Sequence, residues 1–129
     1  MKNLDWYATL NKPKSNPPNW IFAPVWCILY CLIFLSLAIF IFNSSIPQRT
    51  IPLTIFIIQL ILNFSWSPIF FGAKKLGLAL IICILLCLSI IALIISFFSI
   101  SKLAAILLIP YLIWVCFALY LNFMIWRFN

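Results

Sequence analysis

The chain has 129 residues, of which 67% are hydrophobic and 7% are charged. Soluble domains are close to half apolar and a quarter charged, so this composition excludes a water-soluble domain. Eight Lys and Arg residues against one acid give a net charge of +7. These cations are scattered between apolar stretches, which argues against nucleic-acid binding and for contact with lipid headgroups.

Four apolar stretches are long enough to cross the ~30 Å hydrocarbon core of a bilayer as helices. They cover residues 20–42, 51–71, 76–98 and 103–126. The runs are continuous rather than alternating, which favours helices over barrel strands. The breaks between them are short, so neighbouring helices are antiparallel. We therefore predict an all-α integral membrane protein in which a bundle of four transmembrane helices forms one domain over residues 1–129.

The distribution of cations predicts the orientation of this bundle. Six cations fall on one side of the predicted spans: Lys2, Lys12, Lys14, Lys74, Lys75 and Arg127. Arg49 and Lys102 fall on the other side. The positive-inside rule then places both termini in the cytoplasm. The first apolar run is too long for a cleavable signal peptide, and no targeting presequence is evident, so we expect a bacterial inner membrane.

Missing residue types exclude several functions. The chain has no His and no Glu, and its only acid, Asp5, lies outside the predicted spans. A proton-coupled multidrug exporter needs an ionisable group inside the membrane, so that class is excluded. Carboxylate pairs and His-containing catalytic sets cannot be assembled. We predict no metal site and no required cofactor, and we interpret the cysteine pairs Cys27/Cys31 and Cys83/Cys87 as small packing residues.

The second predicted span carries a polar and aromatic face. Gln59, Asn63 and Ser67 recur every four residues, and Trp66 and Phe70 lie beside them. Polar groups in a span turn toward the interior of the bundle. This face therefore predicts either interhelical hydrogen bonds or one wall of a ligand cavity.

The fourth predicted span carries a matching face. Trp114, Ala118 and Asn122 recur every four residues, with Tyr111 on the adjoining ridge. Ala118 is small and leaves a gap between bulky neighbours, as expected for a cavity that accepts a flat aromatic ligand. The alternative is that the amides join helices and the rings fill the core. The third span has no Trp or Tyr, so we interpret it as the most lipid-exposed or a purely packing helix.

Four segments resemble the signature sequences of the translocator protein family, also known as TspO or the peripheral-type benzodiazepine receptor. They read WYATLNKP (Trp6–Pro13), PPNWIFAPVWCILY (Pro17–Tyr30), QLILNFSWSPIFF (Gln59–Phe71) and PYLIWVCFALYLN (Pro110–Asn122). Their order and spacing agree with the family, and the similarity covers essentially the whole chain.

This resemblance implies a bundle of transmembrane helices, commonly a homodimer, with a cavity that binds porphyrins such as protoporphyrin and haem. It also implies synthetic isoquinoline and benzodiazepine ligands, and sterols in some members. By motif position the pocket takes Tyr7, Trp26, Tyr30, Asn63, Trp66, Trp114, Ala118 and Leu121. Phe70, which the periodicity places beside Trp66, completes the predicted ligand-binding set.

Two features depart from the family pattern. Family members usually have five spanning helices, and the Trp-Tyr segment follows the first of them. Only five residues precede Trp6 here, so we expect that first helix to be absent. Phe123 stands where sterol-binding members carry Tyr in a recognition motif that is weak even when complete, so we do not predict physiological cholesterol binding. Residues 1–18, stiffened by three prolines, are expected to form a lid on the cytoplasmic side.

The resemblance implies a membrane receptor for porphyrins and related planar hydrophobic ligands, with a role in tetrapyrrole regulation. One alternative is a transporter of porphyrin or other amphiphiles without proton coupling. Another is light-dependent oxidation of porphyrin, which some bacterial members are reported to perform, and a fourth is a structural membrane subunit without a ligand. In the leading hypothesis a planar ligand stacks on Trp26, Trp66 and Trp114, and Asn63 makes a hydrogen bond to it.

Overall fold

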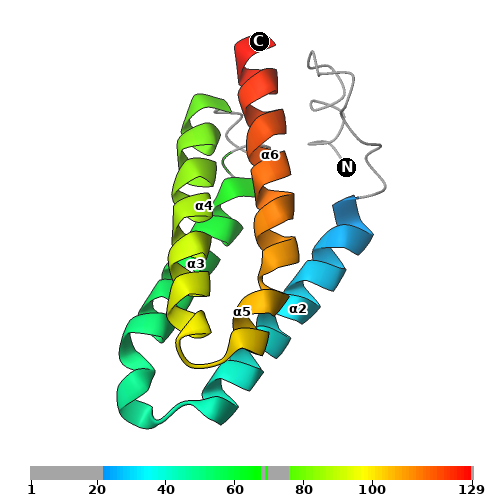
Figure 1. Cartoon of the computed structure of the whole chain (residues 1–129). Helices are drawn as coiled ribbons and strands as arrows, with labels where there is room; N and C mark the ends of the chain where they lie inside the picture. Colours follow the sequence, from blue (N-terminus) through cyan, green and yellow to red (C-terminus); the bar gives the residue numbers. More distant parts are fainter. Residues whose placement is uncertain (1–21, 68, 70–75, 129) are drawn as a thin grey trace.

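A computed structural model describes residues 22–67, 69 and 76–128 of the chain. Its regular elements are all helical: α2 (Phe22–Asn43), the 3₁₀ turn η2 (Ile46–Gln48), α3 (Thr50–Ser67), α4 (Leu76–Phe98), α5 (Lys102–Leu107) and α6 (Ile109–Phe128). Figure 1 shows the four long helices, α2, α3, α4 and α6, side by side in a bundle. The predicted all-α class and the four long helices are confirmed. The predicted lid, residues 1–18, lies outside the described residues.

Within the described residues, three segments are long and apolar enough to cross a membrane: Pro24–Asn43, Gly77–Phe98 and Lys102–Arg127. The fourth helix, α3, is apolar but shorter, with 18 residues. At 1.5 Å per residue it covers about 27 Å, slightly less than the hydrocarbon core. Many large apolar side chains on these helices are exposed, as lipid-facing surfaces require. The chain is therefore an integral membrane protein.

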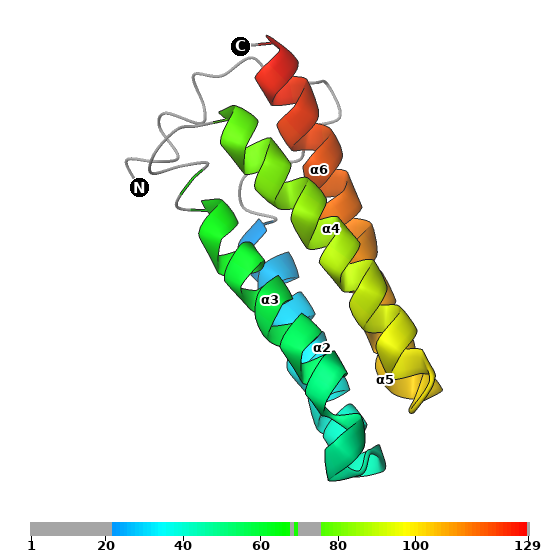
Figure 2. The same ribbon diagram turned by 90° about the vertical axis from the view of Figure 1, so that its left-hand side faces the viewer.

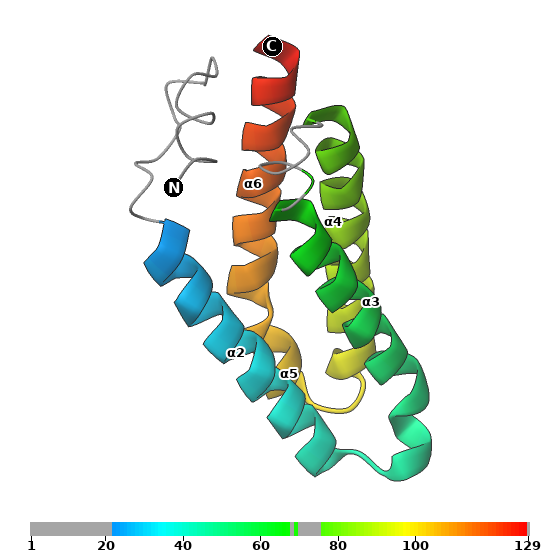
Figure 3. The ribbon, with the colours of Figure 1, turned by 180° about the vertical axis from the view of Figure 1, so that it is seen from behind.

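Helix α4 packs against both α3 and α6, whereas α2 packs against α5 and α6. In the view of Figure 2, α2 and α3 overlap on one side, and α4 and α6 lie on the other. Seen from behind in Figure 3, the C-terminal half of α2 passes beside α5, whereas its N-terminal end leans away from α6. Helix α2 therefore packs mainly on α5. The divergence between α2 and α6 leaves room that aromatic side chains occupy.

Helix α4 is the packing helix of the bundle, in contact with α3, α5 and α6. Its Ile90, Leu93 and Phe97 side chains are fully buried. The Phe97 ring stacks on Phe40 of α2, with centroids 4.3 Å apart and planes 7° from parallel. Residues 76–98 are interpreted from the sequence either as a packing helix or as the most lipid-exposed helix. The second interpretation is wrong, because α4 has the largest buried share of the three spans.

The fourth predicted range, residues 103–126, is interrupted at Leu108, between α5 and α6. The cause is Pro110, which has no N–H to donate and whose ring clashes with the carbonyl four residues earlier. Leu108 N–H consequently bonds to Ala105 O at 3.1 Å instead of reaching Ala104 O. The Ala104 carbonyl accepts from Ser36 Oγ of α2 at 2.6 Å. A hydrogen bond between α2 and α5 thus lies next to the break.

Candidate functional site

An aromatic cluster lies where α2 and α6 diverge. Trp26 contacts Trp114 edge to face, with centroids 6.3 Å apart and planes at 87°. Trp26 also contacts Tyr111 at 6.5 Å and Tyr30 at 5.7 Å. Tyr30 in turn contacts Phe64 of α3 at 5.9 Å. These rings come from three helices, so their mutual position depends on the packing of the bundle rather than on any one element.

A chain of polar side chains runs beneath these rings. Tyr30 O–H donates to Asn63 Oδ1, and Asn63 Nδ2 donates to Tyr111 Oη at 2.7 Å. Tyr111 O–H then donates to Gln59 Oε1 at 2.7 Å. Asn63, Tyr111 and Gln59 are buried, whereas Tyr30 is half-buried. Buried polar groups require such partners, and this chain joins α2, α3 and α6.

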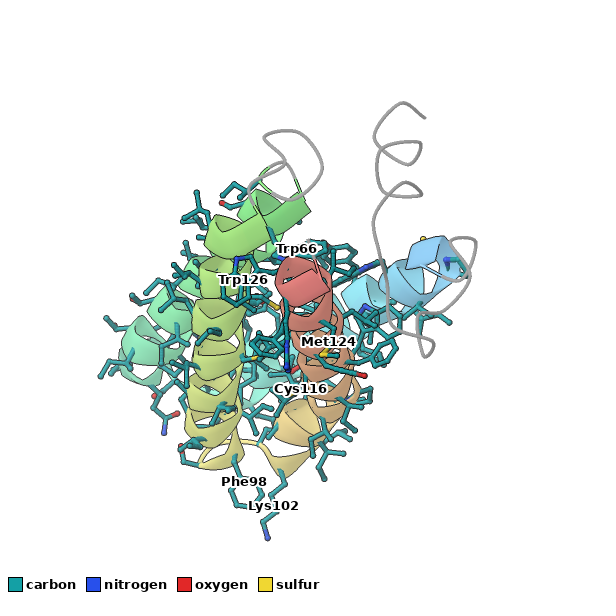
Figure 4. All side chains as sticks on the ribbon, turned by 90° about the horizontal axis from the view of Figure 1, so that it is seen from above. Trp66, Phe98, Lys102, Cys116, Met124 and Trp126 are labelled. Atoms are coloured by element: carbon teal, nitrogen blue, oxygen red, sulfur yellow. The ribbon has the colours of Figure 1, made fainter. Side chains whose placement is uncertain are left out.

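A second polar contact joins α3 to α6. Trp66 Nε1 donates to Asn122 Oδ1 at 2.9 Å. Asn122 is 1% exposed, while Trp66 is half-buried. Figure 4 shows Trp66 close to the C-terminal end of α6. Ala118 is half-buried and Leu121 is buried on the same helix.

The structure brings several predicted site residues together. Trp26, Tyr30, Asn63 and Trp114 are linked by the ring contacts and hydrogen bonds given above. Trp66 forms a separate contact with Asn122. Ala118 and Leu121 lie between Trp114 and Asn122 along α6. Tyr7 and Phe70 lie outside the described residues.

The predicted ligand set did not include Gln59, Tyr111 or Asn122, although the periodicity placed all three on inward faces. Tyr111 and Asn122 bond the predicted residues Asn63 and Trp66, and Gln59 bonds Tyr111. The spacing of four residues between Gln59 and Asn63, and of three between Tyr111 and Trp114, was the available signal. The interhelical hydrogen bonds expected of the three amides are therefore present.

The five cysteines are free, and only Cys83 and Cys87 of the two predicted packing pairs are buried. Cys83 and Cys87 are buried in α4, where they meet Cys116 of α6. Cys27 and Cys31 are exposed on α2 and face outward as lipid-contacting residues do. Among the described residues no group of three metal-binding side chains is close enough to hold an ion.

Comparison with known proteins gives consistent results over almost the whole chain. The profile of the TspO/MBR family matches residues 1–127. The human translocator protein is 38% identical, covering 99% of this chain and 77% of that protein. The tryptophan-rich protein TspO of Chlorobaculum tepidum is 41% identical, and the match covers 99% of this chain and 82% of that protein. The tryptophan-rich sensory protein of Cereibacter sphaeroides is 36% identical, and the match covers 100% of this chain and 80% of that protein. The chain therefore belongs to the TspO/MBR family.

Proposed function

We propose that this protein is a membrane receptor that binds porphyrins, or planar hydrophobic molecules of similar shape, between α2, α3 and α6. The observation that supports the proposal is the aromatic cluster of Trp26 and Trp114 above the buried amide of Asn63. A pocket for a flat ligand needs apolar walls and a few placed polar groups, and these residue types supply both. Every side chain named in this site is neutral, which suits an uncharged macrocycle.

The geometry assigns different tasks to the rings and to the amide. Trp26 and Trp114 meet edge to face, and each aromatic pair is worth about 0.5–1.5 kcal/mol beyond its buried area. A macrocycle that entered between them would exchange this contact for two larger stacking contacts. Asn63 uses one donor and one acceptor on the two tyrosines. Each of its amide atoms keeps capacity for one further hydrogen bond, so it can still bind a ligand.

The test is a titration of the purified protein in detergent with protoporphyrin, followed by quenching of tryptophan fluorescence. We expect saturable quenching, with affinity lowered about tenfold in Trp114→Ala, because about 1.4 kcal/mol of stacking is lost. Trp126→Ala is the matched control, since Trp126 is half-exposed near the end of α6 and outside the proposed site. Equal affinities for wild type and Trp114→Ala would reject this site.

A repeat of the titration in the light and an uptake assay in vesicles separate the alternative functions. Repeating it under light and oxygen tests porphyrin oxidation, which would appear as loss of porphyrin absorbance only in the light. Uptake of porphyrin into vesicles containing the protein would indicate transport. A helical, well-folded sample that shows no saturable quenching would contradict the receptor proposal altogether.

A further inference from the structure

The hydrogen-bond chain through Tyr30, Asn63, Tyr111 and Gln59 has a direction. Each hydroxyl or amide donates to the next group inward, so Tyr30 O–H points to Asn63 and Tyr111 O–H points to Gln59. Three of the four residues are buried, and Tyr30 is the one that is half-buried. Tyr30 is therefore the end of the chain that opens toward the aromatic cluster of the proposed site.

The inner end of this chain is incomplete. Gln59 is fully buried, and its Nε2 has no hydrogen-bond partner among the residues that the structure describes. Buried N–H groups without an acceptor are rare, because removing them from water is not offset by a new bond. Gln59 Oε1 is occupied by Tyr111, so the amide donates nothing while its carbonyl accepts.

The same four side chains can form the chain in the opposite direction. Each amide turns by 180° and each phenolic O–H rotates, with the ring atoms staying in place. Gln59 Nε2 then donates to Tyr111, Tyr111 donates to Asn63 Oδ1, and Asn63 Nδ2 donates to Tyr30. The buried amide gains an acceptor and its carbonyl becomes the unfilled group, which buried sites tolerate better. Tyr30 O–H is then directed away from the other three residues and is available to an acceptor on a ligand.

We propose that this chain is a two-state hydrogen-bond relay whose direction is set by the ligand. A carbonyl or carboxylate on the ligand accepts from Tyr30 O–H, which reverses the chain and satisfies the buried amide of Gln59. The relay thus selects planar ligands that carry acceptor groups at their edge. This inference rests on the proposed function, since it describes how the same site chooses among porphyrins.

Gln59→Met is expected to lock the reversed direction. Without Gln59, the remaining acceptor for Tyr111 O–H within the chain is Asn63 Oδ1, so Asn63 turns its Nδ2 to Tyr30 and frees the Tyr30 O–H. The probe is protoporphyrin dimethyl ester, which has carbonyl acceptors and no carboxyl proton. Its affinity should rise about three- to tenfold, the value of one hydrogen bond. Octaethylporphyrin, which has the same macrocycle and no carbonyl, should bind with unchanged affinity.

Two controls show whether the effect passes through Tyr30. Gln48→Met makes the same chemical change in the exposed connection between α2 and α3, and should leave both affinities unchanged. In a Tyr30→Phe background, Gln59→Met should no longer alter binding of the ester. Suppose that the ester binds wild type. If Gln59→Met then leaves its affinity unchanged, or changes it equally with and without the Tyr30 hydroxyl, the relay is rejected while the receptor proposal stands. If neither porphyrin binds wild type, the receptor proposal itself fails.

A second measurement uses wild-type protein alone and does not depend on how the variants fold. The chain has two glutamines, Gln48 and Gln59. Protein labelled with ¹⁵N at the glutamine side chain therefore shows two NH₂ groups, each with one nitrogen and two protons. The group that disappears in Gln48→Met belongs to Gln48, and the other belongs to Gln59. Bound ester should move one Gln59 proton downfield as that N–H acquires an acceptor, while Gln48 stays in place. Octaethylporphyrin should leave Gln59 unchanged. A Gln59 signal that is unaffected by saturating ester would overturn the relay.

Discussion

Asn63 occupies the point at which α2, α3 and α6 meet. Its carbonyl accepts from Tyr30 and its amide donates to Tyr111, and the residue is 7% exposed. An amide has donors and acceptors on one flat group, so it can bridge two hydroxyls that a Ser or a Gly could not reach. The family signature therefore coincides here with a residue that holds helices together.

Asn63→Leu should lower the free energy of unfolding by about 1–2 kcal/mol, because two interhelical hydrogen bonds are lost in a membrane interior. Unfolding of the protein by denaturing detergent, followed by circular dichroism, measures the change. Ser65→Ala is the matched control, since the Ser65 hydroxyl bonds to Ile61 O within its own helix. A loss in Asn63→Leu no larger than that of the control would show that these bonds do not stabilise the bundle.

At the scale of elements, the most informative feature is the docking of α2 on α5. Ser36 and Ala104 are both fully buried, and the hydroxyl of one bonds the carbonyl of the other at 2.6 Å. At the break that precedes Pro110, Leu108 N–H bonds to Ala105 O and not to Ala104 O, and the Ala104 carbonyl accepts from Ser36. A hydrogen bond between α2 and α5 thus lies next to the break.

Ser36→Ala should destabilise the protein by about 1 kcal/mol, since it leaves the buried Ala104 carbonyl without its side-chain donor. Ser89→Ala is the control, because the half-buried Ser89 hydroxyl bonds to Leu86 O in the same helix. The two variants are compared by thermal unfolding in one detergent. If both variants unfold at the same temperature, the Ser36 bond has no interhelical role.

The cation Arg49 has a structural task as well as a charge. Its guanidinium donates to Ile41 O at 2.9 Å and to Ser44 O at 3.0 Å, both at the C-terminal end of α2. Ile41 lies in the last turn of α2 and Ser44 directly follows it, and a positive charge at this end complements the helix dipole. Lys102, at the same end of the bundle, extends over the Phe98 ring at 5.8 Å, as Figure 4 shows. Both contacts are local to this end, in keeping with the scattered cations of the sequence.

For the whole molecule, the orientation in the membrane stays a prediction. Arg49 and Lys102 lie at one end of the bundle and Arg127 at the other. The sequence predicts that Lys2, Lys12, Lys14, Lys74 and Lys75 fall on the side of Arg127. With these lysines counted there, the positive-inside rule favours cytoplasmic termini. In a bacterial host, a fluorescent protein fused after the C-terminus should therefore fold and emit. Alkaline phosphatase fused after Asn43, at the opposite end, should be active, and the reverse pattern would contradict this orientation.

The homodimer implied by the family resemblance also stays a prediction. Exposed apolar residues cover the outer faces of all four long helices, as they must in lipid. Such faces serve lipid contact and helix contact equally well, so their exposure does not select a partner. Mass determination by light scattering, with the detergent contribution subtracted, would distinguish one 15.0 kDa chain from two.

The sequence by itself determined the class of the protein and the inward faces of its helices. Runs of about 20 apolar residues have no stable place in water, and unpaired backbone in lipid permits only helices or closed barrels. The spacing of Gln59, Asn63 and Trp66 placed these residues on one face, because polar groups avoid lipid. Signature segments around Trp26 and Trp114 were sufficient for the family.

Only the tertiary structure decided which inward residues meet. Spacing along one helix cannot say that Asn63 lies between Tyr30 and Tyr111, because those partners are 33 and 48 residues away. It likewise could not reveal that Ser36 bonds the Ala104 carbonyl next to the break before Pro110. The physical reason is that helix periodicity fixes a direction for each side chain, whereas the rotation and tilt of neighbouring helices fix its partner.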